Sequence, residues 1–389
     1  MTVDAEDWLL DEIASTAVRL AAACFAAIVS DEFDAKILLG RFAHDEAALL
    51  RRACARFDEV ATRTRAPTTL AAALEGRVVP IPDRPCPAFM ACTDWAPYRG
   101  APATSPLADE PTHRYYRERT AIRTRQMAEL RAAGRSACVA PVTRRSLADL
   151  VAALRAIERP GRPATLRLSD AREPVGSTGA PLNALLQQNL VNLEIPTIEL
   201  CCSLILESGD LPLEFVTDMA RQAWDEARHA QLFWTRLSAL GGAVDDYSAS
   251  TVLWRMCRGQ SLAIRLALHQ CAGEWVGVDG AAWYRDAATR AGDPETAALF
   301  DAVMRDELGH VRLGHRWLGV LCPDGQDRAA TRAAAAALRR AAGKSADGPL
   351  AFPLDEALCR AAGFEDDEIA DLATRYRLHG SLAEAAVRP

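Results

Sequence analysis

Apolar residues recur at three- and four-residue intervals along most of the chain, a pattern typical of amphipathic helices. The period-2 alternation expected of half-buried strands is scarce. Prolines and glycines interrupt the helical pattern at residues 63–107 and 159–180. We therefore predict an all-α fold. Outside a central region described below, helices are expected at residues 6–30, 33–62, 112–133, 145–158, 327–342, 354–362 and 366–378.

These interruptions divide the chain into four predicted parts. They are an N-terminal helical hairpin (1–62), a Pro-rich loop with accessory helices (63–180), a central bundle (181–321) and a C-terminal helical extension (322–389). The loop at 63–107 carries aromatic residues, Phe89, Trp95 and Tyr98, among its prolines. Loops of this length are usually functional segments or disordered, and the aromatics argue against pure disorder.

Composition narrows the function classes. Half of the 389 residues are hydrophobic and only 6% are aromatic, which suits a large helical core. A net charge of −7 disfavours nucleic acid as the main partner. The acidic N-terminus gives no sign of a signal peptide, and we expect no apolar run long enough to span a membrane. The eleven cysteines lack metal-ligand spacing, so we expect reduced core thiols in a cytoplasmic protein.

Two short stretches of the central region are nearly alike. Residues 225–229 read DEARH and residues 306–310 read DELGH, so each contains Glu-x-x-His. A glutamate in an apolar run precedes each motif at almost equal distance. Glu194 lies 32 residues before Glu226, and Glu274 lies 33 residues before Glu307. The pattern predicts a duplicated helical hairpin with one Glu on its first helix and Glu-x-x-His on its second.

The spacing also predicts a metal site. Residues three apart on an α-helix lie about 60° apart around its axis, so Glu226 and His229 can face one ion, as can Glu307 and His310. Four carboxylates and two imidazoles in a four-helix bundle are the ligand set of di-iron and di-manganese proteins. Such a set favours iron or manganese over structural zinc, which prefers thiolate ligands.

Some neighbouring residues are alternatives to this ligand set. A single Glu-x-x-His is usually a solvated helix face, but two matched copies with apolar neighbours are rarer by chance. Glu199 lies only 10 residues before the predicted turn at Gly209, whereas Glu194 lies 15 before it and Glu226 17 after it, so Glu194 is the better ligand. Three histidines are open as extra ligands, although helical geometry directs the second and third about 140° away from neighbouring ligands: His44, His269 and His315.

Four runs, at residues 192–200, 225–229, 274–279 and 306–310, resemble the ferritin-like di-iron carboxylate proteins, and most closely a bacterial ferritin-like family of unassigned function. The resemblance covers residues 181–321. It implies these ligands: Glu194, Glu226, His229, Glu274, Glu307 and His310. It also implies that Asp225 orients His310 and that Asp306 orients His229. Pro196, two residues after Glu194, is expected to kink or open its helix beside the metals.

The resemblance implies a non-haem di-iron oxygenase or oxidase. Such an enzyme uses O₂ to oxidise a small organic substrate by hydroxylation, desaturation or N-oxygenation. The expected cofactors are two iron ions, with manganese or a mixed Fe/Mn pair as alternatives, and an external electron donor is expected. A homodimer stays open. Other functions compatible with the same ligands are a ferroxidase, a dimanganese catalase and a non-catalytic bundle stabilised by metal. Substrate, reaction subtype and donor cannot be told from the sequence.

Overall fold

The computed structural model describes residues 5–62, 64–82, 102, 106, 109–133, 142–169, 182–342, 354–374 and 376. These residues are mostly helical, in agreement with the prediction from apolar spacing. The elements, in which η denotes a π-helix, are α1 (Ala5–Val29), α2 (Phe33–Val60), α3 (Leu70–Ala73), β1 (Val79–Pro82), α4 (Glu110–Ala132), β2 (Val142–Arg145), α5 (Leu147–Ala156), α6 (Leu182–Asn189), η3 (Leu190–Glu194), α7 (Ile195–Leu206), α8 (Leu213–Ala239), α9 (Val252–Cys257), α10 (Leu262–Leu266), η4 (Ala267–Cys271), α11 (Ala272–Arg290), α12 (Pro294–Leu321), α13 (Gly325–Ala341) and α14 (Glu356–Ala361).

The chain forms two compact units. Unit 1 comprises residues 1–171, 187–234 and 243–254, and unit 2 comprises residues 172–186, 235–242 and 255–389. Unit 1 therefore contains α1, α2, α4, α7 and most of α8, and unit 2 contains α10 to α14. The four-part division expected from the sequence stays a prediction.

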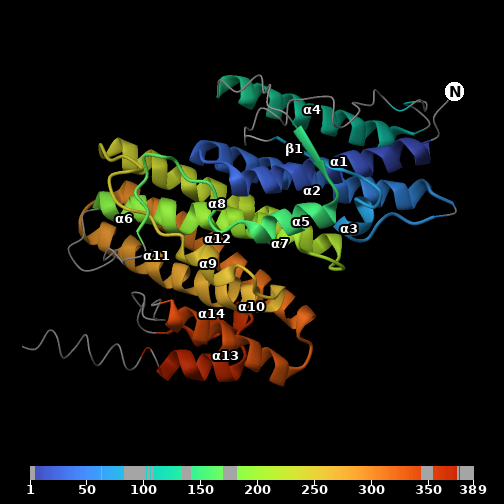
Figure 1. Cartoon of the computed structure of the whole chain (residues 1–389). Coiled ribbons are helices and arrows are strands. Elements are labelled where there is room, and N and C mark those ends of the chain that lie inside the picture. Colours follow the sequence, from blue (N-terminus) through green and yellow to red (C-terminus); the bar gives the residue numbers. More distant parts are fainter. Residues whose placement is uncertain are drawn as a thin grey trace, which may run out of the picture. The chain divides into compact units, whose positions relative to one another are not determined.

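Unit 1 is built on the hairpin of α1 and α2, the two blue helices that run side by side in Figure 1. Gly40 lets α2 approach its neighbours closely. A Cβ atom at this position would lie 3.1 Å from both the Ala223 carbonyl oxygen of α8 and the Ile198 Cγ2 atom of α7. This close packing fixes α7, which follows directly after Glu194, and α8, which carries Glu226 and His229, against the hairpin.

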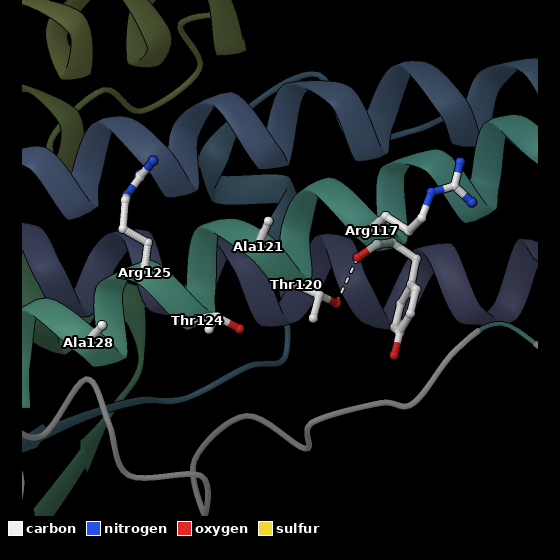
Figure 2. Close-up of a pocket in the computed structure, with 7 residues that line it drawn as sticks. Arg117, Thr120, Ala121, Thr124, Arg125 and Ala128 are labelled. Atoms are coloured by element: carbon white, nitrogen blue, oxygen red, sulfur yellow. Dashed lines mark hydrogen bonds between the residues drawn. The ribbon is translucent and has the colours of Figure 1, made fainter.

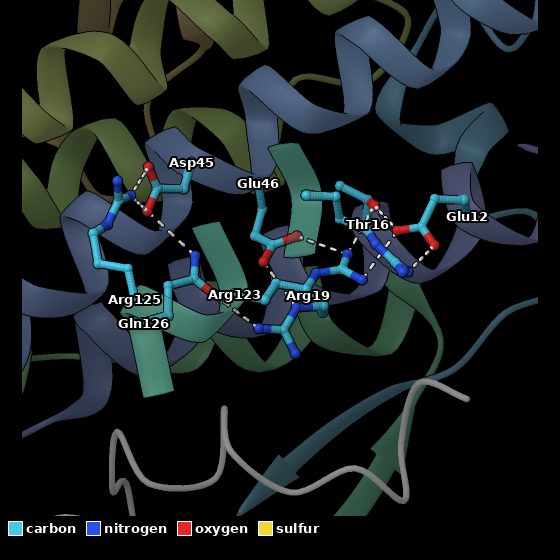
Figure 3. Close-up of polar contacts among 9 residues, drawn as sticks. Glu12, Thr16, Arg19, Asp45, Glu46, Arg123, Arg125 and Gln126 are labelled. Atoms are coloured by element: carbon cyan, nitrogen blue, oxygen red, sulfur yellow. Dashed lines mark hydrogen bonds and ion pairs between the residues drawn. The ribbon is translucent and has the colours of Figure 1, made fainter. Parts of the chain in front are cut away.

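Helix α4 is held to this hairpin by buried charges rather than by an apolar face (Figure 3). The Arg123 guanidinium lies 3.0 Å from Glu12 of α1 and 3.2 Å from Glu46 of α2. Arg119 pairs with Glu12 at 2.7 Å, and Arg19 of α1 pairs with Glu46 at 2.8 Å. Buried charges must be paired to be tolerated, so these three helices are locked in one register.

The described part of the Pro-rich loop contains more regular structure than the sequence suggested. It includes α3 and strand β1, which pairs antiparallel with β2 so that Val79 faces Arg145 and Pro82 faces Val142. The three loop aromatics, Phe89, Trp95 and Tyr98, lie outside the described residues.

Unit 2 is built on the hairpin of α11 and α12. Gly292, with φ at 72°, occupies the left-handed region at the turn, and the Asp293 side chain caps α12 by accepting from the Thr296 amide. The C-terminal helices pack on this hairpin through an apolar cluster that includes Trp275, Val311 and Tyr376. The Tyr376 hydroxyl donates to Asp279 of α11 in a short, buried hydrogen bond.

Among the described residues, two helical stretches are long and apolar enough to cross a membrane, Ala5–Val29 and Leu182–Leu206. The expectation that no run would reach this length was therefore wrong: alanine is the commonest apolar residue of the first stretch, and leucine and isoleucine are the commonest of the second. In each, 83% of the most apolar window is buried inside the protein. Core helices pass the same test, so these stretches are weak evidence for a membrane span.

Candidate metal centre

Unit 1 brings together three of the predicted ligands: Glu194 of η3, and Glu226 and His229 of α8. Their possible ligand atoms lie within 4.8 Å of one another. The His229 Nδ1 atom is 3.2 Å from Glu226 Oε2 and 3.4 Å from Glu194 Oε2. None of the three residues is more than 4% exposed. We call this group the first half-site.

Electrostatics in the first half-site favour a cation. Burial raises the pKa of Glu194 well above its usual range; the hydrogen bond from His229 opposes this, and the negative charge of Glu226 adds to it. Two carboxylates in one dry pocket repel each other unless a proton or a metal ion lies between them. The Gln222 amide, which donates to Glu226 Oε1 at 3.4 Å, offers only a neutral partner.

Unit 2 brings together the other three predicted ligands: Glu274 of α11, and Glu307 and His310 of α12. Their possible ligand atoms also lie within 4.8 Å of one another. The His310 Nδ1 atom is 3.3 Å from Glu307 Oε2, which matches the relation of His229 to Glu226. All three residues are buried. We call this group the second half-site.

A π-helical turn precedes the first glutamate of each half-site, a feature that the sequence analysis missed. Turn η3 ends at Glu194, and η4 ends three residues before Glu274. Such turns insert a residue into a helix and are frequent at functional sites. Pro196 gives a local signal for η3, because it has no amide hydrogen to donate to the turn before it. The Thr197 hydroxyl also donates to the Leu193 carbonyl of this turn, at 2.8 Å.

The π-turn η4 overturns one expectation. His269 was predicted to point about 140° away from Glu274, as it would on a regular α-helix. In the structure its Nδ1 atom lies 2.9 Å from Glu274 Oε1, and both side chains are buried. The extra residue in the turn rotates His269 onto the face that Glu274 occupies.

Glu199, the alternative first-helix glutamate, has a different environment. Its carboxylate lies 2.8 Å from the Lys36 ammonium and accepts two bonds from the Arg162 guanidinium. Both cations are almost completely buried. Burial lowers the pKa of Lys36 to about 8, although Glu199 opposes the shift. Glu199 is thus the anion of a buried ion triad.

The remaining candidates lie outside these groups. Asp225 accepts from Arg221 and Arg228 on its own helix, and its predicted role toward His310 stays a prediction, as does that of Asp306 toward His229. His44 is half-buried beside Asp225 and Arg221, and burial lowers its pKa.

Two further groups among the described residues near the end of unit 2 differ from the half-sites. His315 packs on Phe364, with ring centroids 4.5 Å apart, and burial lowers its pKa to about 4. A third carboxylate group nearby contains Glu365, Asp367 and Glu368, and Arg328 and Arg332 form ion pairs with all three.

A surface hollow of about 580 Å³ lies along one face of α4 (Figure 2). Its described lining contains none of the six predicted ligands: it consists of Tyr116, Arg117, Thr120, Ala121, Thr124, Arg125 and Ala128. It is therefore not part of either half-site.

Comparison with known proteins gives a family and no activity. An uncharacterised protein of Haemophilus influenzae is 32% identical over 111 residues, which is 28% of this chain and 38% of that protein. No solved structure matches the chain. Residues 113–370, more than half of the chain and including both half-sites, match a family described as "Protein of unknown function (DUF455)". The chain is therefore a member of the DUF455 family.

Proposed function

We propose that this chain is a ferritin-like non-haem di-iron oxidoreductase that uses O₂ to oxidise a small organic substrate. One observation carries the proposal. Two buried groups, each of two glutamates and one histidine, occur with the same residue order and near-equal spacing, and each converges within its own unit. We propose that each half-site holds one metal ion, so that the chain binds the two ions that the duplicated motif predicts.

The donor chemistry fits iron. Each half-site offers carboxylate oxygens and one imidazole nitrogen, a mixed set suited to iron or manganese. Burial, and to a smaller extent the charge of Glu226, raises the pKa of Glu194, and a bound metal ion would offset the cost of keeping this carboxylate charged. Bound iron would supply electrons for the reduction of O₂.

The side chains would leave room for reactants. Four glutamates and two histidines offer at most ten donor atoms (4 × 2 + 2), fewer than the twelve positions of two octahedral ions. Glu226 and Glu307 would hold the adjacent imidazoles of His229 and His310 in one orientation. Because all six side chains are buried, bulk water would be excluded from the oxidation.

Substrate oxidation is preferred over iron storage because this chain has much structure outside the two ligand hairpins. The α1–α2 hairpin, α4 and the C-terminal helices add surfaces that a ferroxidase or a metal-stabilised bundle does not require. We further propose an external electron donor and a cytoplasmic location.

The test is the metal content and O₂ reactivity of the purified full-length chain. We expect up to two iron ions per chain by elemental analysis, with a coupled pair in the Mössbauer spectrum. Glu226→Ala and Glu307→Ala should each lose at least one ion while the far-UV circular dichroism is kept. The reduced iron-loaded protein should consume O₂ faster than either variant. One equivalent of zinc alone after metal-replete expression would contradict the proposal, as would a reduced protein that is inert to O₂.

A further inference from the structure

The second half-site has an imidazole that the duplicated motif does not include. His269 contributes its Nδ1 atom 2.9 Å from Glu274 Oε1, and it is only 5% exposed. The residue five positions before Glu194 in the first half-site is Asn189, which has no ionisable ring. The two half-sites are therefore chemically unequal, although their motifs match.

Two contacts hold the turn that presents His269. The Arg339 guanidinium of α13 donates to the Leu268 carbonyl of η4 at 3.3 Å. Gly314 of α12 lies directly against the turn, since a Cβ atom there would be 2.7 Å from Gln270 Cβ and 2.8 Å from the Gln270 carbonyl carbon. Gly314 is one helical turn beyond His310, so the same stretch of α12 supplies a predicted ligand and the seat for η4.

The two groups are close enough to pair. The Nδ1 atom of His269 lies 2.9 Å from Glu274 Oε1, so a hydrogen on Nδ1 would let the ring pair with the carboxylate. His269 is not among the residues whose ligand atoms converge around Glu274, Glu307 and His310. Its position therefore suits a residue that orients the ligand Glu274 better than a residue that binds the metal itself.

We propose that His269 is a positioning residue of the second half-site. It holds Oε1 of Glu274 and so directs the other carboxylate oxygen, Oε2, toward a metal ion. Neighbours that orient ligands in this way commonly change metal affinity by about 10–100-fold. The proposal rests on the metal-binding function proposed above. It adds that the two half-sites bind their ions with different affinities. It also adds that the contact between α13 and η4 supports binding at the second half-site.

The first arm of the test needs no metal. In metal-free protein with ¹⁵N-labelled histidine, NMR should show a protected proton on Nδ1 of His269. The signal should disappear or shift strongly in Glu274→Leu, whereas the signals of His315 should not change. A His269 ring that carries its only proton on Nε2 would overturn the proposal, whatever the metal content.

The second arm is an anaerobic Fe(II) titration of the full chain. His269→Leu should lower the affinity for one of the two equivalents of Fe(II) by about 10–100-fold. This should be the same equivalent whose binding is lost in Glu307→Ala. His269→Asn, whose amide N–H replaces the Nδ1–H, should recover most of the affinity. His315→Leu, a matched buried histidine in the same unit, should leave both equivalents unchanged.

The outcomes separate the two proposals. If His269→Leu lowers the affinity for both equivalents of Fe(II) equally, His269 has only a structural role. The same conclusion follows if His269→Asn does not restore the affinity. Nitrogen from His269 coordinated directly to iron, seen by pulsed EPR of ¹⁵N-labelled protein, would also overturn the positioning role. Wild-type protein that binds no iron would overturn the metal centre and this inference together, whereas normal binding with an unaffected His269→Leu would overturn only the inference.

Discussion

At the scale of single residues, the partner of each buried carboxylate decides its role. Glu194 and Glu199 lie five positions apart in one apolar helical stretch, and both are buried. Glu194 faces another carboxylate and a histidine, whereas Glu199 faces Lys36 and Arg162. The first environment calls for an added cation, and the second already contains two. The same residue type is thus a candidate ligand in one place and a structural anion in the other.

Substitution of these two glutamates should separate metal binding from stability. Glu199→Ala should lower the free energy of unfolding by about 3–5 kcal/mol, because two buried cations lose their counter-charge. It should leave the metal stoichiometry intact wherever the protein is folded. Glu194→Ala should lose metal with little loss of stability in the metal-free form. Urea unfolding and elemental analysis of both variants provide the check, and loss of metal from Glu199→Ala alone would reverse the assignment.

At the scale of helices, packing contacts hold local irregularities in place. Turn η4 departs from the α-helix where Gly314 presses against it and Arg339 takes one of its carbonyls. Helix α4 presents arginines to α1 and α2, where Glu12 and Glu46 pair with them. In both cases the position of an element depends on a few specific contacts with its neighbours.

Gly314→Ala should damage η4. The added methyl group would lie 2.7 Å from Gln270 Cβ and 2.8 Å from the Gln270 carbonyl carbon, so the turn must shift, at a cost of about 1–3 kcal/mol. Binding of the second equivalent of iron should weaken as His269 and Glu274 move. Gly319→Ala is the matched control on the same helix. No heavy atom lies within 4 Å of its Cβ position, and alanine should stabilise the helix by about 0.5–1 kcal/mol. Equal effects of the two substitutions on stability would contradict the packing argument.

The buried ion pairs between α4 and the α1–α2 hairpin should make the stability of the fold depend on pH in the acidic range. Burial raises the pKa of Glu46, but Arg19 and Arg123 lower it by more, so its folded-state pKa lies below the ordinary value of 4.5. A depressed carboxylate pKa stabilises the fold above the unfolded-state pKa, and this contribution is lost as the pH falls through the folded-state pKa. The free energy of unfolding of the wild-type protein, measured with urea, should therefore fall below about pH 4.5. Glu46→Gln should be less stable near neutrality and should vary less with pH over this range; an unchanged slope would refute the role of Glu46.

At the scale of the whole molecule, metal binding should contribute to the stability of the folded chain. The half-sites exist only when the chain is folded, so metal binds the native state in preference to the unfolded state. At 100 times the dissociation constant, one bound ion adds about 2.7 kcal/mol.

Removal of metal by a chelator should accordingly lower the midpoint of thermal unfolding, and Fe(II) added under nitrogen should restore it. Glu226→Ala and Glu307→Ala should each lose part of this response. Glu365→Gln, in the carboxylate group that Arg328 and Arg332 already pair with, should keep the full response. A midpoint that is indifferent to metal in wild type would speak against a site with useful affinity.

The sequence by itself determined the helical class, the approximate helix bounds and the two Glu-x-x-His motifs. These follow from periodicity within one or two turns, where residues three or four apart share a face whatever the rest of the chain does. Only the tertiary structure decided where His269 points and which cations Glu199 meets. Lys36 is 163 positions away from Glu199, and Arg339 is 71 positions from the carbonyl that it binds in η4. The partners of a buried charge, and the place where a helix widens by one residue, are set by which elements pack together, and local spacing carries no record of that.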